Sequence, residues 1–332
     1  NSYFSNVFRL AVDNPAYKNV DEGYAHWKRY MNSFGFGVKL NTDIPSEDDG
    51  LVVDTSFYNR LYHNSWNSCT NVFLGIGQGE LQATPLQMAN MMCIIANKGY
   101  YYTPHFVNTI DGKGDGDSIL DPFRIKHEVT KIPADIYETV QLGMQDVVDN
   151  GTGRVARIPG IAVAGKTGTA ENYGIINGKR EKLEDHSWFV CFAPRENPRI
   201  AVAVIVENAG FGATWAGPIA SMIMEKYLND TLSTERMKDF DRIAEHEIIL
   251  PIVKQKRMRL DSLRQIKLAL EMGDSSVLQN SLPSAPDVPR IDVNIEKKKP
   301  QIVQPPRDTI PKPQKKDSTR EVAALSREEK EG

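Results

Sequence analysis

The sequence predicts an α/β fold of the α+β type, in which an antiparallel sheet is flanked by helices. The apolar runs at 187–193 and 199–207 are separated only by the polar turn PRENP, which is typical of a hairpin of buried strands. The apolar stretch at 217–228 follows soon after and has the length of a helix that packs on a sheet. The run IAVAGKTGTA at 161–170 predicts one more strand.

The first part of the chain predicts helices. Aromatic and aliphatic residues recur at helical spacing over 1–12, and a second helix is expected over 22–34. The glycines of GFG at 35–37 predict a turn after that helix. Residues 41–72 are polar and rich in turn formers, so no element is predicted there.

Two helices in the middle of the chain carry signals at their ends. The first begins at Thr84 and Pro85 with a capping box completed by Gln87, and Gly99 ends it. Its predicted apolar face consists of Met88, Met91, Met92 and Ile95. The second runs over 133–148 and ends at DNGTG, with Ile136, Val140, Met144 and Val147 predicted on its apolar face.

The composition of the chain changes after residue 229. We expect three parts: a globular domain at 1–229, a charged and helical extension at 230–282, and a tail at 283–332. Eight of the chain's 19 prolines lie in the tail, mixed with EKKK and KPQKK. Such a composition cannot bury a core, so disorder is predicted for the tail.

Composition and charge argue against several classes of function. The formal net charge of −3 predicts no attraction to nucleic acid. Three distant cysteines and six scattered histidines form no metal-binding motif or disulfide framework, so neither metal nor cofactor is expected. No apolar run is long enough to cross a bilayer, and no signal peptide is recognised. Because the chain starts at Asn1 in the middle of helical spacing, we expect that an upstream part is missing.

The stretch AGKTGT at 164–169 raises two hypotheses. With Gly160 it matches the phosphate-loop pattern Gly-x-x-x-x-Gly-Lys-Thr. However, the variable residues Ile, Ala, Val and Ala are typical of a strand, and no helical spacing follows Lys166. The alternative is the Lys-Thr-Gly signature of serine enzymes that recognise penicillin. The residues around the motif favour this second hypothesis.

Each residue of Lys-Thr-Gly-Thr suits a strand at the edge of a cleft that holds an extended peptide. Lys166 supplies a positive charge for a carboxylate or for proton transfer, and Thr167 supplies a hydroxyl. Gly168 lets the substrate backbone approach closely. Thr169 offers a backbone N–H to a developing oxyanion. An ordinary exposed Lys-Thr-Gly turn is the simpler alternative for these residues alone.

Residues 1–229 resemble the C-terminal two-thirds of the transpeptidase domain of class B penicillin-binding proteins, most of all the elongation type, conventionally numbered two. The resemblance rests on six stretches in the same order and spacing: NSYF (1–4), FGFG (34–37), GIGQGELQATPLQMANMMCIIANKG (75–99), GMQDVVDNGTG (143–153), VAGKTGTAEN (163–172) and HSWFVCFAPRENPRIAVAVIVENAG (186–210). It implies a β-lactamase/transpeptidase-like fold that is incomplete at its N-terminus.

The resemblance also implies a function. It predicts a serine D,D-transpeptidase that crosslinks peptidoglycan stem peptides ending in D-Ala-D-Ala through an acyl-enzyme, and that β-lactams acylate. It implies a role in cell elongation and shape, an anchor in the bacterial inner membrane with the domain facing the periplasm, and a membrane glycosyltransferase as partner. A carboxypeptidase or β-lactamase of the same fold, and a penicillin-sensing or scaffolding domain, remain alternatives.

The resemblance assigns the site residue by residue. Lys166 and Asn1 are the expected catalytic residues, with Asn1 as the last residue of a Ser-x-Asn motif. Thr167, Gly168 and Thr169 are the expected substrate-binding residues. The nucleophile belongs to a Ser-x-x-Lys motif, which the sequence does not contain, so we expect it upstream and expect this chain alone to be inactive. Ser2, Ser5, Ser187 and His186 are predicted to be structural.

Overall fold

The structure is a computed structural model that describes residues 1–110, 118–176, 178–247, 249 and 251–271. The described helices are α1 (Ser2–Val12), α2 (Val20–Ser33), α3 (Thr55–Leu61), α4 (Pro85–Ala96), α5 (Ala134–Asp149), α6 (Ala216–Asn229), α7 (Thr234–Ala244) and α8 (Pro251–Glu271). Three short 3₁₀ helices join them: η1 (Val72–Ile76), η2 (Asp121–Arg124) and η3 (Arg154–Ala156). The described strands are β1 (Tyr100–Tyr102), β2 (Lys126–Glu128), β3 (Ala164–Ala170), β4 (Tyr173–Ile176), β5 (Lys179–Lys182), β6 (His186–Ala193) and β7 (Ile200–Val206).

A three-stranded antiparallel sheet with the order β3-β6-β7 lies at the centre of the domain, and helices pack on it. Side chains of β6 alternate between its two faces, as the pleat of a strand requires. Phe189 and Cys191 belong to a core with Met224 of α6, whereas Val190 and Phe192 belong to another core with Met92 of α4. Both faces of the sheet are therefore buried, which explains why β6 is apolar at almost every position.

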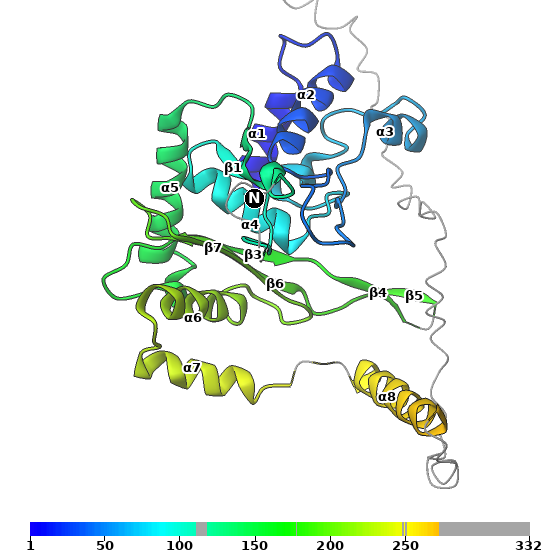
Figure 1. Ribbon diagram of the computed structural model, residues 1–332. Helices are drawn as coiled ribbons and strands as arrows, with labels where there is room; N and C mark the ends of the chain where they lie inside the picture. Colours follow the sequence, from blue (N-terminus) through cyan, green and yellow to red (C-terminus); the bar gives the residue numbers. More distant parts are fainter. Residues whose placement is uncertain (111–117, 177, 248, 250, 272–332) are drawn as a thin grey trace, which may run out of the picture. The chain divides into compact units, whose positions relative to one another are not determined.

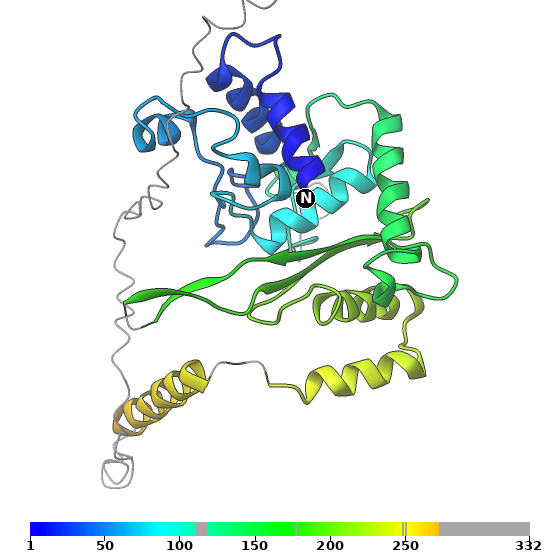
Figure 2. The ribbon, with the colours of Figure 1, turned by 180° about the vertical axis from the view of Figure 1, so that it is seen from behind.

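Helices cover the two faces of the sheet. In Figures 1 and 2, α6 lies on one side of β3, β6 and β7, and α1, α2 and α4 lie on the other side. The predicted hairpin at 187–207 and the predicted helix at 217–228 are confirmed as β6–β7 and α6. The α+β fold class is confirmed as well, because antiparallel strands and segregated helices make up the described domain.

An aromatic core holds the N-terminal helices together. Tyr24 of α2 and Tyr58 of α3 are fully buried, and their rings lie edge to face with centroids 5.4 Å apart. Each buried hydroxyl has a partner, because Tyr24 donates to the Val53 carbonyl and Tyr58 donates to Glu80 at 2.8 Å. Burial raises the pKa of both tyrosines. This part of the fold includes the segment 41–72, for which no element was predicted.

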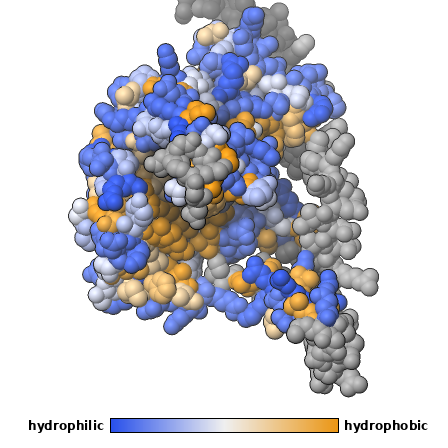
Figure 3. Space-filling view, in the orientation of Figure 1, coloured by the Kyte–Doolittle hydropathy of each residue, from blue (hydrophilic) through white to orange (hydrophobic). Residues whose placement is uncertain are grey.

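The predicted helix ends agree well with the structure, but one predicted face is wrong at two of its four positions, while its Met144 is buried as predicted. The capping box of Thr84 and Gln87 is present in α4, with both hydrogen bonds formed. In α5, Ile136 and Val140 are exposed, and Tyr137 and Gln141 are buried in their place. Figure 3 shows hydrophobic surface lining a hollow near the middle of the face seen in Figure 1.

The strand predicted over 161–170 is shorter in the structure, where β3 begins at Ala164. Beyond residue 229 the structure contains α7 and α8, which are separate helices rich in charge. The tail predicted to be disordered at 283–332 lies outside the described residues. In the part of the chain that the structure describes, no helix combines the length and the apolar character needed to cross a membrane.

Candidate active site

Strand β3 carries the Lys-Thr-Gly-Thr signature at the edge of the described central sheet. Lys166 pairs with Val190 of β6 and Thr167 pairs with Phe189, so both residues lie in extended backbone within a regular ladder. A phosphate loop would place this lysine at the start of a helix, where backbone N–H groups could wrap a phosphate. The strand therefore contradicts the phosphate-loop hypothesis and agrees with a peptide-binding edge.

The ammonium group of Lys166 lies along this edge. Its Nζ atom donates a hydrogen bond to the Thr167 carbonyl at 2.7 Å. The side chain is exposed, yet the surrounding protein removes part of its hydration, and this desolvation lowers the pKa of Lys166. A lysine with a lowered pKa releases its proton more readily, which suits a group that moves protons in a cleft.

The hydroxyl of Thr167 is held by a second hydroxyl that the sequence prediction missed. The Oγ1 atoms of Thr167 and Thr152 are 2.8 Å apart, which is the ordinary length of a hydrogen bond between hydroxyls. Thr152 lies in the loop between α5 and η3. No periodicity or local motif signals this contact, because the loop and β3 meet only in the folded chain.

The carbonyl of Thr169 is also in use. Gln78, which follows η1, donates from its Nε2 atom to the Thr169 carbonyl at 3.3 Å. Carbonyls two residues apart along a strand point the same way, so Thr167 and Thr169 present their carbonyls to one edge of β3. Both carbonyls receive side-chain donors there. This edge therefore accepts side-chain donors, and Gln78 is one from outside the sheet.

A glycine loop lies against the middle of the signature. A methyl group at position 212 would lie 2.2 Å from the Trp188 carbonyl oxygen and 2.6 Å from that of Gly168. Only glycine permits so close an approach of two backbones. Ser187 of β6 fixes this loop, because its hydroxyl donates to the Phe211 carbonyl at 2.9 Å and accepts from the Ala216 N–H at 3.2 Å.

Asn1 is exposed at the start of α1, where its carbonyl accepts the Ser5 N–H at 3.0 Å. Helix α1 packs closely on η1, so that a methyl group at Gly75 would lie 2.6 Å from the Phe8 Cβ atom. Gln78, at the end of η1, then reaches Thr169. Contacts thus run from the helix of Asn1 to β3, while the catalytic role of Asn1 stays a prediction.

Two of the residues predicted to be structural, Ser187 and His186, have hydrogen-bond partners in the fold. Ser187 is fully buried and makes the two hydrogen bonds described above. The Nδ1 atom of His186 accepts the Asn208 N–H at 3.1 Å, which fixes the turn after β7. Among the described residues, no cluster of His, Cys, Asp and Glu could hold a metal ion.

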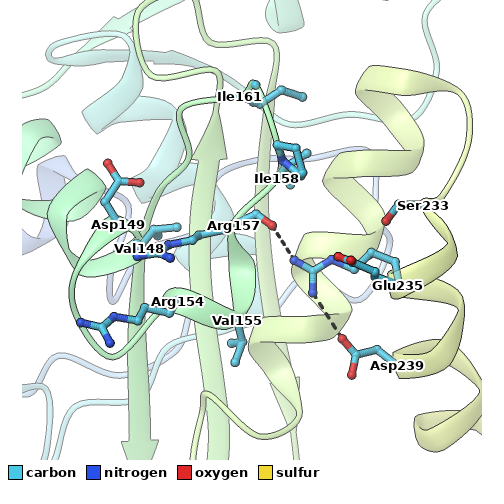
Figure 4. Close-up of a pocket in the computed structure, with 13 residues that line it drawn as sticks. Val148, Asp149, Arg154, Val155, Arg157, Ile158, Ile161, Ser233, Glu235 and Asp239 are labelled. Carbon is cyan, nitrogen blue, oxygen red and sulfur yellow. Dashed lines mark hydrogen bonds and ion pairs between the residues drawn. The ribbon is translucent and has the colours of Figure 1, made fainter.

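A cavity of about 570 Å³ lies away from this edge, between η3, the loop at 157–161 and α7. Figure 4 shows Arg154 and Arg157 on one side of this cavity and Glu235 and Asp239 of α7 on the other side. The Nη2 atom of Arg236 donates to the Arg157 carbonyl at 2.6 Å, and Asp239 lies 3.4 Å from Nη1. The charges of Arg236 and Asp239 pair with each other, so this cavity lies in the interface between the domain and helix α7.

Comparisons with known proteins agree with this geometry. A family model described as the penicillin binding protein transpeptidase domain matches residues 1–225. Peptidoglycan D,D-transpeptidase MrdA of Haemophilus influenzae is 34% identical over 223 residues, which cover 63% of this chain and 34% of that protein. The Acinetobacter baumannii protein of the same name is 34% identical over 238 residues, or 68% and 34%. The chain thus spans about a third of the length of these relatives.

Solved structures show the same likeness. Pseudomonas aeruginosa PBP2, solved in complex with WCK 5153, is 34% identical with a TM-score of 0.55, over 71% of this chain and 49% of that one. Helicobacter pylori PBP2, solved in complex with MreC, is 24% identical with a TM-score of 0.52, over 70% and 38%, and shows the fold alone. By its family match over residues 1–225, the chain belongs to the transpeptidase-domain family of the penicillin-binding proteins.

Proposed function

We propose that this chain carries the substrate-binding strand of a serine-type peptidoglycan D,D-transpeptidase that acts in cell elongation. The observation that carries the proposal is β3, a sheet-edge strand with the Lys-Thr-Gly-Thr signature, in a chain of the transpeptidase-domain family. The names of the MrdA relatives support the reaction class.

In this proposal the stem peptide lies along β3 as an added strand. Its terminal carboxylate binds the Thr167 hydroxyl near the positive charge of Lys166. Gly168 leaves room for the peptide backbone, and the Thr169 N–H donates to the oxyanion that forms at the reacting carbonyl. Asn1 lines the cleft as the last residue of Ser-x-Asn.

The proposed reaction has two steps. A serine hydroxyl, from a Ser-x-x-Lys motif that residues 1–332 do not contain, attacks the carbonyl of the penultimate D-alanine. The terminal D-alanine leaves with the proton, and an ester to the enzyme remains. The amine of a neighbouring stem peptide then attacks this ester, forms the crosslink and returns the proton to the serine. Lys166, with its lowered pKa, assists these proton transfers.

We also propose where the protein works. In this proposal the domain faces the periplasm from an anchor in the inner membrane and works with a membrane glycosyltransferase. The names of the relatives, peptidoglycan D,D-transpeptidases, support a site of action at the cell wall. Helicobacter pylori PBP2 was solved in complex with MreC, so a protein like MreC is a second candidate partner. The charged extension at 230–282 is proposed as a separate part that follows the catalytic domain.

Intact mass after incubation with benzylpenicillin tests the proposal. A form of the protein extended upstream through a Ser-x-x-Lys motif, called the full-length protein below, should gain one covalent adduct, and residues 1–332 alone should gain none. Absence of an adduct on both proteins would refute a penicillin-binding transpeptidase. A donor peptide ending in D-Ala-D-Ala then separates the alternatives: transfer to an added amine indicates a transpeptidase, release to water a carboxypeptidase, and no turnover a sensing domain.

A further inference from the structure

Thr152 lies outside the signature, yet its hydroxyl meets the signature's own hydroxyl. The distance between the Oγ1 atoms of Thr152 and Thr167 is 2.8 Å. Thr152 belongs to the loop at 150–153, which joins α5 to η3 and is exposed at this residue. An exposed threonine in a loop usually turns its hydroxyl to water, so the direct contact with β3 calls for an explanation.

The loop that carries Thr152 is held firmly in place. The Gly151 N–H donates to the Asp146 carbonyl at 3.0 Å, and the Gly153 N–H donates to the Val147 carbonyl at 2.9 Å. Both bonds end on carbonyls in the last turn of α5, which also accept the Asn150 and Gly151 N–H groups at 2.7 and 3.1 Å. A methyl group at Gly153 would also lie 3.4 Å from the Phe189 ring of β6. The position of the Thr152 hydroxyl relative to the sheet is therefore fixed by the fold.

The two hydroxyls must divide their protons. Each threonine hydroxyl has one proton to donate and can accept two hydrogen bonds. If Thr152 donates to Thr167, the Thr167 proton is free for a substrate. A hydroxyl that accepts one bond also becomes a better donor for the next. A carboxylate only accepts hydrogen bonds, so its presence next to Thr167 selects this direction of the pair.

We propose that Thr152 is a positioning residue that donates to Thr167 and directs the Thr167 proton at the substrate carboxylate. The inference rests on the proposed function, since both the D-Ala-D-Ala terminus and penicillin carry that carboxylate. Thr152 acts through Thr167 and does not touch the substrate. It therefore determines specificity for ligands that have a free carboxylate.

The test compares acylation of the full-length protein by benzylpenicillin and by its methyl ester, which lacks the charge. Thr152→Val keeps the shape of the side chain and removes the hydroxyl. It should slow acylation by the free acid about five- to tenfold, which is the effect expected from the loss of one hydrogen bond. Acylation by the ester should slow less than about twofold. Thr152→Ser should restore the rate with the acid, because it keeps a hydroxyl.

Two further variants complete the test. Thr152→Val should cost nothing in a Thr167→Val background, because its effect passes through Thr167. Thr139→Val, on the same helix that leads to the loop, removes a hydroxyl that bonds only to the Asp135 carbonyl, and it should leave both rates unchanged.

Several outcomes would overturn the inference. Equal losses with acid and ester would assign Thr152 a purely structural role. A loss that persists in the Thr167→Val background would make Thr152 a direct ligand of the substrate. Failure of the unmodified full-length protein to react with either compound would refute the proposed function and this inference with it. If the unmodified protein reacts and Thr152→Val leaves both acylation rates unchanged, only this inference is refuted.

Discussion

Arg236 holds helix α7 against the domain, and we predict that replacing Arg236 lowers the free energy of unfolding. Helix α7 lies beyond the residues that the family model matches. Arg236 is 12% exposed and lies 3.6 Å from Glu225 of α6, which is only 5% exposed. The Oε1 atom of Glu225 accepts the Ser233 N–H at 3.2 Å, but Oε2 has no hydrogen-bond donor. The buried carboxylate therefore depends on the charge of Arg236.

The size of the effect follows from this burial. Removing one partner of a buried ion pair costs about 3–5 kcal/mol, because the other charge stays buried without compensation. Glu225 keeps the Ser233 N–H, and Arg236 is not fully buried, so the lower end of the range applies. We expect Arg236→Met to lower the free energy of unfolding by about 3 kcal/mol. For a domain of this size that corresponds to a fall in Tm of about 6–12 °C.

Urea denaturation of residues 1–332, with the helical signal as readout, measures the change. Lys238→Met is the matched control on the same helix, because Lys238 is exposed. A surface substitution of this kind changes stability by less than about 0.5 kcal/mol. The double change Arg236→Met with Glu225→Gln should recover most of the stability. Equal effects of Arg236→Met and Lys238→Met would refute the reasoning.

Three further predictions concern β3. Gly212→Ala should lower the free energy of unfolding by about 2–3 kcal/mol, measured in urea, because the new methyl group clashes with two backbone carbonyls. The control Gly143→Ala should raise it by about 0.5–1 kcal/mol, because Gly143 lies in a helix and has open space around it. Gln78→Ala should speed penicillin acylation of the full-length protein about two- to threefold by freeing a carbonyl for the ligand, and slower acylation would contradict this. Partial desolvation lowers the pKa of Lys166 in the folded chain, so the unfolded chain binds this proton more tightly. Between that lowered pKa and the ordinary value of about 10.4, the stability of the natural protein relative to Lys166→Met should therefore rise with pH, and a flat difference in titrated urea curves would count against it.

Local sequence signals predicted the elements that local physics determines. The capping box of Thr84 and Gln87 spans three residues, and its two hydrogen bonds need no other part of the chain. The hairpin β6–β7 follows from two apolar runs and a short turn. The apolar residues Ile161 to Ala164 predict a strand and not a phosphate loop, and the structure confirms strand β3. Local sequence alone therefore predicts the element that carries the signature.

Contacts between distant segments account for what the sequence did not predict. On α5, Gln141 is buried and the predicted core residue Val140 is exposed. The Nε2 atom of Gln141 donates to the Ile95 carbonyl at 2.7 Å, and this carbonyl in the last turn of α4 also accepts the Lys98 N–H at 3.2 Å. Hydropathy cannot anticipate the burial of a polar side chain that bonds to the end of another helix. Gln78 and Thr169 are likewise 91 residues apart in sequence.

The loop at 211–215 shows how the extension and the candidate site depend on one fold. On one side Gly212 lies against the backbone of Gly168. On the other side the ring of Trp215 is covered by two residues that follow α6: His246 at 4.5 Å between ring centroids, and Arg242 at 5.2 Å from the guanidinium carbon. Arg242 also donates to the Thr214 carbonyl at 3.4 Å. The loop at 211–215 is therefore packed between the extension and the strand that holds the signature, and at Gly212 it has no room for a methyl group.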